Sequence, residues 1–405
     1  MMYRISRAAR WLSLPFVALP LTAAAVSFNR DIAPIVDKHC ASCHHAGGIG
    51  PFSLISFKEV RSHASQIAAV TKQRYMPPWP PEAGYGDFAD ERRLSEAEIR
   101  TLAAWAKEGA PEGPPTERPD PPNYGDGWQL GTPDLIVRMP APYTIAPEGT
   151  DVFRNFVIRT GLANTKYIRA AELRLDNTRV VHHANLVLDR TQSLRRRDGE
   201  DGHPGFSGMD ILTEPAAGDF DPDSHFLFWK PGTVLHPESD AMSWRLDPHT
   251  DLVINLHLQP TGKQERIQAE VGLYFASSAP TVFPMLVQLE HDGAIKIPPG
   301  TSNFVITDEL TLPVDSKVLA IYPHAHYLGK VIEAWATLPG GHREWLIRIP
   351  DWDINWQAVY EYKHPVLLQK GTKVEMRITY DNSTSNGRNP NHPPRPVRAG
   401  NKRGG

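Results

Sequence analysis

Six prolines lie between Ala110 and Pro122 and divide the chain into two parts with different sequence patterns. Proline fixes its own φ angle and lacks a backbone N–H donor, so such a run cannot continue a helix or the interior of a sheet. Segments of this kind form semi-rigid, extended spacers. A chain of 405 residues is long enough for two or three domains. We therefore expect a Pro-rich linker over residues 113–128, with separate domains before and after it.

The part before the linker has the periodicity of helices. Apolar residues recur every three or four positions after Phe28 and again after Val60. Ser95 and Glu98 have the spacing of a capping box, which marks the start of a third helix. We expect a small all-α domain over residues 27–112. Its expected core side chains are Phe28, Ile32, Ile35, Val36, Val60, Ala64, Ile67, Val70, Ile99, Leu102 and Trp105.

The part after the linker has short apolar runs and alternating polar and apolar residues, separated by Pro, Gly and Asp. This pattern is typical of an all-β protein. The span is long for one sandwich, so we expect two jelly-roll-like sandwiches, over residues 129–280 and 281–405. The expected strands are 135–138, 152–159, 167–175, 179–189, 226–229, 252–259, 271–275, 303–312, 317–322, 331–338, 345–349 and 374–380.

Residues 1–25 have the three parts of a secretory signal peptide. Arg4, Arg7 and Arg10 come before an apolar run, and small residues follow it at the expected cleavage site. The run is too short to span a bilayer comfortably, which disfavours the alternative of an uncleaved membrane anchor. We expect an exported protein, periplasmic or secreted, with no membrane span after cleavage. The net charge of −3 gives no reason to expect a nucleic-acid partner.

The only two cysteines of the chain form the motif Cys40-Ala-Ser-Cys43-His44. A C-x-x-C-H motif attaches c-type haem, because the two thiols add to the vinyl groups and the adjacent imidazole reaches the iron. The alternatives are a redox-active C-x-x-C pair and half of a zinc site. No second cysteine pair exists to complete a zinc site. Export also favours haem, since c-type haem is assembled outside the cytoplasm.

Helices around this motif resemble those of a small class I cytochrome c. Residues 27–112 resemble the cytochrome modules that are fused to larger bacterial enzymes. In that family a methionine in a later loop is the second iron ligand, and the resemblance assigns this role to Met76, in Arg74-Tyr-Met-Pro-Pro-Trp79. A thioether ligand raises the reduction potential, which suits an electron carrier. His45 and His63 are the alternative ligands.

Five histidines occur in, or at the ends of, three strongly apolar expected strands: His182, His183, His257, His324 and His326. A single histidine on such a strand is usually a satisfied core residue, but five are harder to explain by packing. In an extended segment residues i and i+2 point to the same face, so His324 and His326 can aim at one point. Imidazole is a ligand for copper, zinc, iron and nickel, so these histidines are candidate metal ligands.

Residues 129–405 resemble the copper type II, ascorbate-dependent monooxygenases, the family of dopamine β-monooxygenase and peptidylglycine α-hydroxylating monooxygenase. That family folds as two jelly rolls, each with one copper. The resemblance implies an electron-transfer copper on His182, His183 and His257, and a catalytic copper on the other two histidines, His324 and His326. The matching motifs are Val181-His-His-Ala184, Trp229-Lys-Pro-Gly232, Leu256-His-Leu-Gln-Pro-Thr-Gly262 and His324-Ala-His-Tyr-Leu-Gly-Lys330.

The resemblance implies an enzyme that hydroxylates a C–H bond of a small organic substrate with O₂. In that family one copper activates O₂, and the other supplies the second electron across a solvent-filled gap. The fused cytochrome would replace or supplement ascorbate, or another external reductant, as electron donor, and a periplasmic electron-donor protein is an expected partner. Adjacent residues of an ideal strand face apart, so His182 and His183 can share one copper only at a bend or a β-bulge.

Two departures from the family pattern bear on activity. The catalytic copper of the family has a methionine as third ligand, after a stretch that matches Asn389-Pro-Asn-His-Pro-Pro394, and here the chain reaches Gly405 without one. We therefore expect the second sandwich to lack its last strand and this ligand. Met376 lies on the preceding strand, and His364, His392 or water are other groups that could complete the site.

The second departure concerns the substrate. The peptide-amidating members carry an arginine two positions before the H-x-H motif, and this chain has Tyr322 there. A peptide C-terminus is therefore not the expected substrate. The missing methionine supports an alternative, a non-catalytic periplasmic electron-transfer or copper-binding protein. A third alternative, a carbohydrate- or partner-binding sandwich with an attached cytochrome, leaves the five histidines unexplained.

Overall fold

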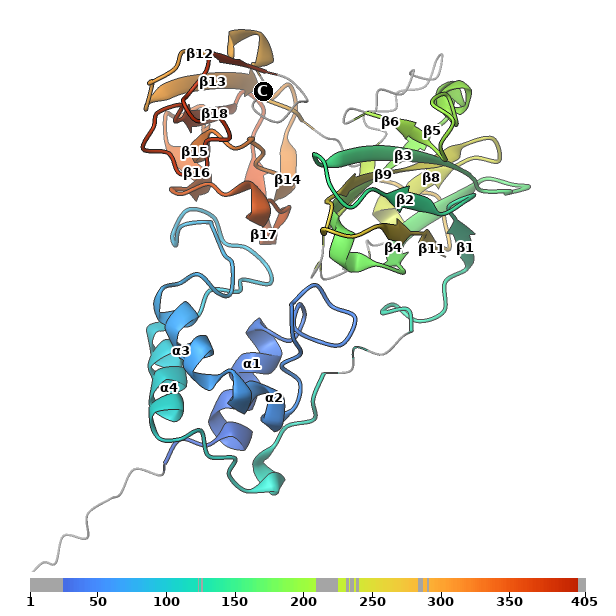
Figure 1. The fold of residues 1–405 in the computed structure, drawn as a ribbon. Coiled ribbons are helices and arrows are strands. Elements are labelled where there is room, and N and C mark those ends of the chain that lie inside the picture. Colours follow the sequence, from blue (N-terminus) through green and yellow to red (C-terminus); the bar gives the residue numbers. More distant parts are fainter. Residues whose placement is uncertain are drawn as a thin grey trace, which may run out of the picture.

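The computed structural model describes residues 25–122, 124, 127–208, 225–230, 233, 237, 240–282, 287–289 and 291–399. The fold is mostly β-sheet with few helices. Figure 1 shows a helical segment (residues 25–118), a first β unit that contains strands β1 to β11, and a second β unit that contains β12 to β19. Nearly all of the predicted signal peptide lies outside the described residues. Within them, no helix has the length and apolar character needed to cross a membrane.

The helical segment has the predicted helices, with one of them divided. The Ser95 capping box is present, since the Ser95 hydroxyl accepts from the Glu98 N–H at 3.2 Å and the Glu98 carboxylate accepts from the Ser95 N–H at 2.7 Å. The predicted second helix is interrupted at His63, where φ and ψ are −112° and 9°. The bounds are η1 (Phe28–Ile32), α1 (Ala33–His39), α2 (Phe57–Ser62), α3 (Ala64–Lys72) and α4 (Glu96–Lys107).

The Pro-rich stretch begins as part of the helical segment. The Asn29 side-chain amide donates to the carbonyls of Gly113 and Pro114, both at 3.1 Å. Arg118 forms an ion pair with Asp37 at 2.9 Å. The chain therefore stays attached to the helices as far as Arg118 before it continues toward the first β unit.

The first β unit is built from antiparallel sheets. One sheet has the strand order β1–β11–β4–β8, and another has the order β6–β3–β9–β5–β7, while β10 pairs with β2. The bounds are β1 (Leu135–Arg138), β2 (Tyr143–Ile145), β3 (Val152–Arg159), β4 (Lys166–Leu175), β5 (Val181–Asp189), β6 (Phe206–Ser207), β7 (His225–Trp229), β8 (Trp244–Leu246), β9 (Asp251–Leu258), β10 (Glu265–Ile267) and β11 (Ala269–Phe275).

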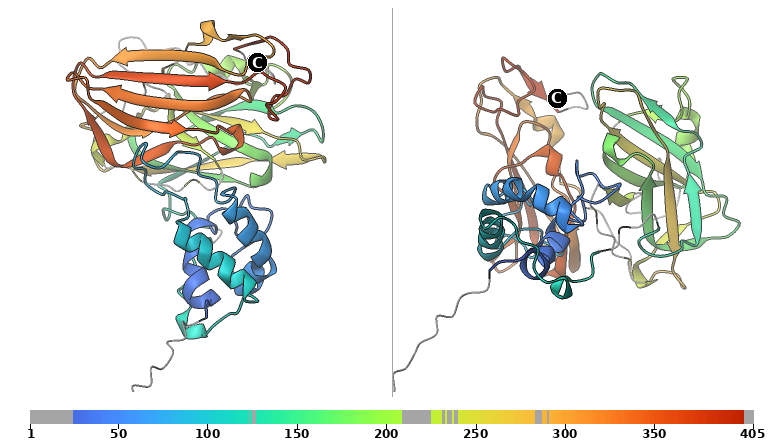
Figure 2. Two further views of the ribbon diagram at one scale, coloured as in Figure 1. Left: turned by 90° about the vertical axis from the view of Figure 1, so that its left-hand side faces the viewer. Right: turned by 60° about the horizontal axis from the view of Figure 1, so that its bottom comes forward.

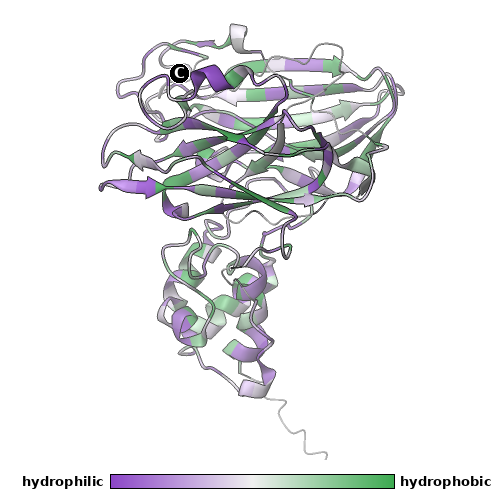
Figure 3. Cartoon of the chain, turned by 90° about the vertical axis from the view of Figure 1, so that its right-hand side faces the viewer, coloured by the Kyte–Doolittle hydropathy of each residue, from purple (hydrophilic) through white to green (hydrophobic). Residues whose placement is uncertain are grey.

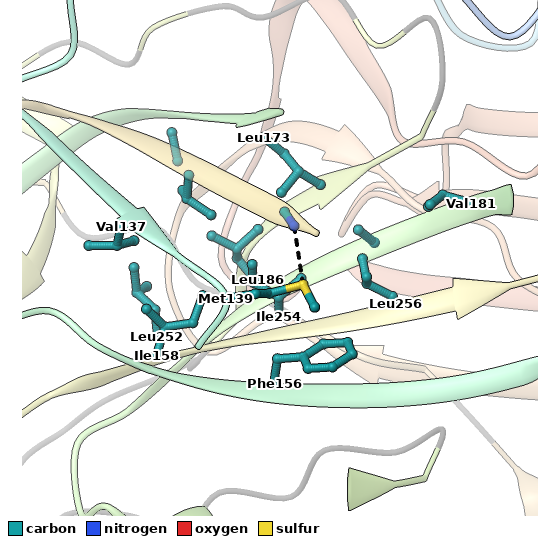
Figure 4. Packing of buried hydrophobic residues seen from close by; sticks show 14 of the residues in the cluster. Val137, Met139, Phe156, Ile158, Leu173, Val181, Leu186, Leu252, Ile254 and Leu256 are labelled. Atoms are coloured by element: carbon teal, nitrogen blue, oxygen red, sulfur yellow. Dashed lines mark hydrogen bonds between the residues drawn. The ribbon is translucent and has the colours of Figure 1, made fainter. Parts of the chain in front are cut away.

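Side chains from both larger sheets meet in one core, which makes this unit a sandwich. Leu186 and Ile254 come from the five-stranded sheet, and Leu173 comes from the four-stranded sheet (Figure 4). The Ala269 N–H donates to the sulfur of Met139 at 3.2 Å within the same core. Along many strands hydrophilic and hydrophobic residues alternate (Figure 3), as expected when one face is buried. β9 is buried over its whole length, so it holds the centre of the sheet.

The second β unit is also antiparallel. Its strand orders are β13–β18–β15–β16, β14–β17 and β12–β19. Its core includes Trp352, Ile347 and Ala336, each at most 1% exposed. The bounds are β12 (Lys296–Ile297), β13 (Phe304–Thr311), β14 (Ser316–Ile321), β15 (Gly329–Thr337), β16 (Arg343–Ile349), β17 (Tyr360–Leu368), β18 (Lys373–Tyr380) and β19 (Val397–Arg398).

A loop of the helical segment reaches the second β unit, and we call residues 77–93 the docking loop. Phe88 pairs with Tyr362 in an antiparallel bridge, and the Ala89 N–H donates to the Glu361 carbonyl at 2.8 Å. Phe88 is 3% exposed and belongs to the core of the second β unit. Figure 2 shows the helices beside the two β units, with this loop reaching toward the orange strands. The loop between α3 and α4 thus adds a strand-like piece to β17.

Every predicted strand overlaps an observed one, and 135–138 and 152–159 agree with β1 and β3 at both ends. β17 is not among the predicted strands, and it contains Pro365, a residue that usually argues against a strand. Pro365 lies where the pairing of β17 with β14 shifts register, so no ladder hydrogen bond is lost there. This part of β17 faces the docking loop instead.

Candidate functional site

The three histidines of the first β unit lie on two neighbouring strands. His182 and His183 are at the start of β5, and His257 is near the end of β9. The strands pair with His183 opposite His257, and the register shifts between Val181 and His183. The bend or β-bulge predicted at His182 and His183 is therefore present. The extra residue in β5 lets both adjacent histidines turn toward His257.

The Nδ1 atoms of these histidines converge. His182 Nδ1 lies 3.1 Å from His183 Nδ1 and 3.1 Å from His257 Nδ1. A metal bound to imidazole nitrogen at about 2.0–2.1 Å holds tetrahedral ligand atoms about 3.3 Å apart. Over the described residues, this is the one group of three or more His, Cys, Asp or Glu close enough to hold a metal ion. The cluster could therefore bind a metal through three Nδ1 atoms.

Burial keeps two of these rings neutral. It lowers the pKa of His182 to about 4, with His257 adding to the effect. It lowers the pKa of His183 to about 2, with smaller contributions from His257, His182 and His324. A neutral imidazole is the form that binds a metal, so both rings are ready to act as ligands at pH 7. The contribution of His324 also places the second histidine group within electrostatic reach of the first.

Asp151, just before β3, supports His257 from the other side of its ring. His257 Nε2 lies 3.0 Å from the Asp151 carboxylate, and Phe153 stacks on the ring with centroids 4.2 Å apart. The carboxylate favours a proton on Nε2, which leaves the Nδ1 lone pair directed at His182. The same carboxylate accepts from the Tyr327 hydroxyl of the second β unit at 3.5 Å.

The second histidine pair follows β14 and lies in the extended connection to β15. Ala325, between the two histidines, is 3% exposed, and its carbonyl accepts from Trp352 Nε1 at 3.0 Å. Because Ala325 faces the core, His324 and His326 project from the opposite side of the backbone. Their ring centroids are 5.2 Å apart. The structure thus brings this pair together, as the i, i+2 spacing predicts.

Aromatic side chains connect the two histidine groups across the gap between the β units. The centroid distances are 5.4 Å from His183 to Phe228, 4.6 Å from Phe228 to Tyr322 and 6.1 Å from Tyr322 to His324. The Gln357 side-chain amide donates to the Tyr322 hydroxyl. Tyr322, two positions before the H-x-H motif, therefore lies between the two histidine groups.

The residues considered as a third ligand of the second site have other surroundings. Met376 lies on β18 opposite Ala334 and packs against the core of the second β unit. His364 lies on β17 and lines a surface pocket of about 280 Å³ together with Asp87 and Trp345.

The C-x-x-C-H motif follows α1 in a tight turn. The N–H groups of Cys43 and His44 donate to the Cys40 carbonyl at 3.2 and 3.0 Å, and both thiols are free. Burial, with Cys43 nearby, raises the pKa of Cys40 to about 12. Redox-active C-x-x-C pairs have a thiol with a lowered pKa. The surroundings of Cys40 therefore disfavour a redox pair.

His44 is oriented to bind a metal through Nε2. Its Nδ1 lies 3.1 Å from the Phe52 carbonyl oxygen, which favours a proton on Nδ1 and a lone pair on Nε2. Gly50 lies against the ring, and a Cβ at this position would come within 2.6 Å of His44 Nδ1. The free thiols and the oriented imidazole fit a covalently attached haem with His44 as an iron ligand.

The predicted second iron ligand, Met76, and its alternatives, His45 and His63, have different surroundings. Met76 is half-buried at the start of the loop after α3. His63 stacks on Phe52 with centroids 3.8 Å apart. His45 stacks on Tyr124 at 4.2 Å. Ligation by Met76 stays a prediction.

The loop after the haem motif contacts the first β unit next to the histidine cluster. The Thr178 hydroxyl donates to the Gly47 carbonyl at 3.2 Å. Thr178 belongs to the short helical turn that leads directly into β5 and His182. Lys230, in the predicted Trp-Lys-Pro-Gly motif, lies close enough to interact electrostatically with Cys43 and with His182. The helical segment therefore touches the first β unit where the histidine cluster begins.

Several residues of the site escape sequence reasoning. Asp151, Thr178 and Phe228 belong to no motif, and Tyr327 lies in the H-x-H motif without a role that the sequence indicates; the partners of all four are distant in sequence. Asp151 lies 106 positions before His257, so no local pattern signals their contact. Tyr322 is visible in the sequence as a departure from the family pattern, but its place between the two histidine groups is not.

Comparison with known proteins gave no match, either to a family model or to a curated protein. The sequence motifs and the geometry of these sites are therefore what support a function.

Proposed function

We propose that this protein is an exported haem- and copper-dependent monooxygenase that hydroxylates a C–H bond of a small organic substrate with O₂. One observation carries the proposal: the Nδ1 atoms of His182, His183 and His257 converge on one point, within reach of a second histidine pair. The C-x-x-C-H motif, on a segment that contacts the same β unit, adds a third candidate redox site. Copper at the two histidine sites would supply one electron each and a position for O₂, and haem would feed electrons singly.

The side chains of this protein do the positioning. Asp151 orients His257, and the bulge in β5 brings His182 and His183 to the same face. Phe228 and Tyr322 contact each other between the two histidine groups, with ring centroids 4.6 Å apart, so side chains cover part of the distance between the groups. Electron transfer over a packed path is faster than through an equal length of open solvent. The contact between Phe228 and Tyr322 therefore favours electron exchange between the sites.

Electrons would enter at the first β unit. The Thr178–Gly47 hydrogen bond joins the loop after His44 to the turn that leads into His182. This short route supports a direct path from the haem motif to the three-histidine cluster. The predicted external donor, ascorbate or a periplasmic protein, would reduce the haem.

A second candidate function is a non-catalytic electron-transfer or copper-binding protein. The number of ligands at the second site favours this function. Among the described residues, His182, His183 and His257 form the one group of three candidate metal ligands, whereas His324 and His326 are two. Water or an undescribed residue would have to complete the coordination of His324 and His326. Copper content separates the two candidates.

The first experiment measures copper and covalent haem in the full exported chain. Two coppers per haem support the monooxygenase, and one copper per haem supports the electron-transfer alternative. A protein without copper would contradict both. Covalent haem is measured independently as the pyridine haemochrome.

The second experiment tests the electron route with His257→Ala. The reduced protein is mixed with O₂ and candidate substrates, and haem reoxidation and hydroxylated product are followed. We expect the variant to lose one copper and to reoxidise its haem at least tenfold more slowly. His342→Ala, at an exposed turn between β15 and β16, is the matched control and should behave as wild type. Unchanged haem-dependent turnover in His257→Ala would show that the route is wrong.

A further inference from the structure

Two buried polar groups lie side by side where the docking loop meets the second β unit. Tyr360 is 3% exposed, and its hydroxyl has no hydrogen-bond partner among the described residues. The buried indole N–H of Trp79 likewise has no partner among them. The two rings are perpendicular, with centroids 5.4 Å apart. A buried polar group without a partner is unfavourable, so two neighbouring ones point to a ligand that accepts hydrogen bonds.

The backbone holds these two groups firmly. Tyr360 is the first residue of β17, and Trp79 is near the start of the docking loop. Phe88 packs against both rings, at 6.3 Å from Trp79 and 5.5 Å from Tyr360. The hydrogen bond from Ala89 to Glu361 fixes the loop beside the strand. The arrangement is therefore built by elements from two parts of the chain.

Burial alone does not explain the missing partner. Tyr362, two residues along the same strand, is also buried and also contacts Phe88. Its hydroxyl donates to the Leu346 carbonyl at 2.9 Å. The same strand thus satisfies one tyrosine inside the protein and leaves the other available.

One cation, Arg92, acts on the buried phenol of Tyr360. Arg92 is close enough to act electrostatically on the Tyr360 phenol and also on Lys230 of the first β unit. Burial lowers the pKa of Lys230 to about 8, and Arg92 adds to the effect. Lys230 in turn lies near Cys43. A cation near the two buried donors favours an anionic ligand over a cationic one.

We propose that Tyr360 and Trp79, with Arg92 nearby, bind a carboxylate at the junction of the helical segment and the β units. The Tyr360 hydroxyl can donate a hydrogen bond, and the Trp79 indole N–H can only donate one. A carboxylate offers two acceptor oxygens for these two donors. One source is a propionate of the haem attached to Cys40 and Cys43, which rests on the proposed function. The other is a free carboxylate from solution. In either case a residue of the second β unit completes a site that the helical segment begins.

The test uses the full haem-loaded chain and compares Tyr360→Phe with Tyr362→Phe. The second variant also removes one buried hydroxyl from β17, so it controls for general effects on packing. The readout is the haem reduction potential, measured by spectroelectrochemical titration with and without acetate as the free carboxylate. Covalent haem content, determined first, reports on the proposed function separately.

If the ligand is a haem propionate, Tyr360→Phe leaves its negative charge less compensated and favours ferric haem. We expect about a tenfold change in the ferric–ferrous equilibrium, which is about 59 mV toward more negative potential, regardless of acetate. If the ligand is a free carboxylate, acetate shifts the wild-type potential, and Tyr360→Phe abolishes that response. Tyr362→Phe should match wild type in both cases.

Equal potentials in both variants with no response to acetate would overturn the proposal and leave an ordered water as the partner of Tyr360. Should the chain carry no covalent haem, the haem part of the proposed function fails on its own. Acetate binding is then followed by tryptophan fluorescence. Binding that Tyr360→Phe abolishes would support a free carboxylate, and absence of binding would overturn the proposal.

Discussion

At the scale of single residues, Asp151 is the least expected part of the candidate metal site. Its carboxylate lies 3.0 Å from Nε2 of His257, a member of the three-histidine cluster. It also accepts from Tyr327, the neighbour of His326. One carboxylate thereby orients a ligand of one histidine group and reaches the other group. Such outer partners fix the tautomer and ring orientation of metal-binding histidines.

We predict that Asp151→Asn lowers the copper affinity of the three-histidine cluster by about 10- to 100-fold, because His257 loses its orienting charge. Equilibrium dialysis against a copper chelator measures the change. Tyr327→Phe removes the 3.5 Å contact but keeps the Asp151 carboxylate beside His257, and it should leave the affinity within about twofold of wild type. Equal affinities in wild type and Asp151→Asn would show that the carboxylate does not position the ligand.

The same residues show how far sequence reasoning reaches. The candidate metal-binding histidines could be predicted because they stand in short motifs on apolar strands, and the structure brings each group together. The bulge in β5 could be predicted because two adjacent histidines cannot otherwise share a face. Asp151 and Tyr360 could not be predicted, because their roles depend on partners brought close only by folding. Ligation by Met76 and the attachment of haem stay predictions.

At the scale of elements, Glu333 ties three strands of the second β unit together. It lies on β15, accepts from Arg377 of β18 at 2.7 Å and from Arg348 of β16 at 3.2 Å, and its side chain is 7% exposed. Burial alone would raise the pKa of Glu333, but the hydrogen bonds and charges of Arg377 and Arg348 outweigh it and lower the pKa. Arg348 also contacts Glu82 of the docking loop.

We predict that Glu333→Gln lowers the free energy of unfolding by about 2 kcal/mol at pH 7, because it removes the carboxylate that pairs with Arg348 and Arg377. The loss stays moderate because both arginine side chains are partly exposed to solvent. A lowered folded-state pKa gives stability that is present above the unfolded value of about 4.3 and is lost as pH falls through the folded value. The difference from wild type should therefore shrink on going from pH 7 to pH 3. Urea denaturation at both pH values measures it.

The exposed Glu309–Lys373 pair on the neighbouring strands provides the control, with side chains 58% and 42% exposed. Glu309→Gln should change stability by less than about 0.5 kcal/mol. A loss in Glu333→Gln that is equal at both pH values would indicate a packing effect instead of a charge effect.

At the scale of the whole molecule, the docking loop joins the helical segment to the second β unit, although the first β unit lies between them in sequence. Phe88 fills a position in the core of the second β unit. Trp79 and Tyr85 add ring contacts to Tyr360 and Trp345, at 5.4 and 4.9 Å. The two parts are therefore expected to unfold together.

We predict that Phe88→Ala lowers the stability of this joined body by about 3 kcal/mol, because a fully buried aromatic side chain leaves a cavity. In this variant we also expect the helices to melt before the β units, which would appear as a separate first transition in calorimetry and in far-UV circular dichroism. Leu367→Ala, at a side chain that is 68% exposed on β17, should leave a single transition. One unchanged transition in Phe88→Ala would show that the helical segment does not depend on the loop.

The contacts of the helical segment with both β units also restrict domain motion. Thr178 of the first β unit bonds to Gly47, and Trp356 of the second β unit meets Tyr75 with ring centroids 6.4 Å apart. Together with the contacts between the β units, these close the three bodies into a ring. Two sandwiches joined only by a linker could move apart about a hinge. Here each of the three parts contacts the other two, so opening one interface would strain another. By contacting both β units, the helical segment thus limits how far the two histidine groups can separate.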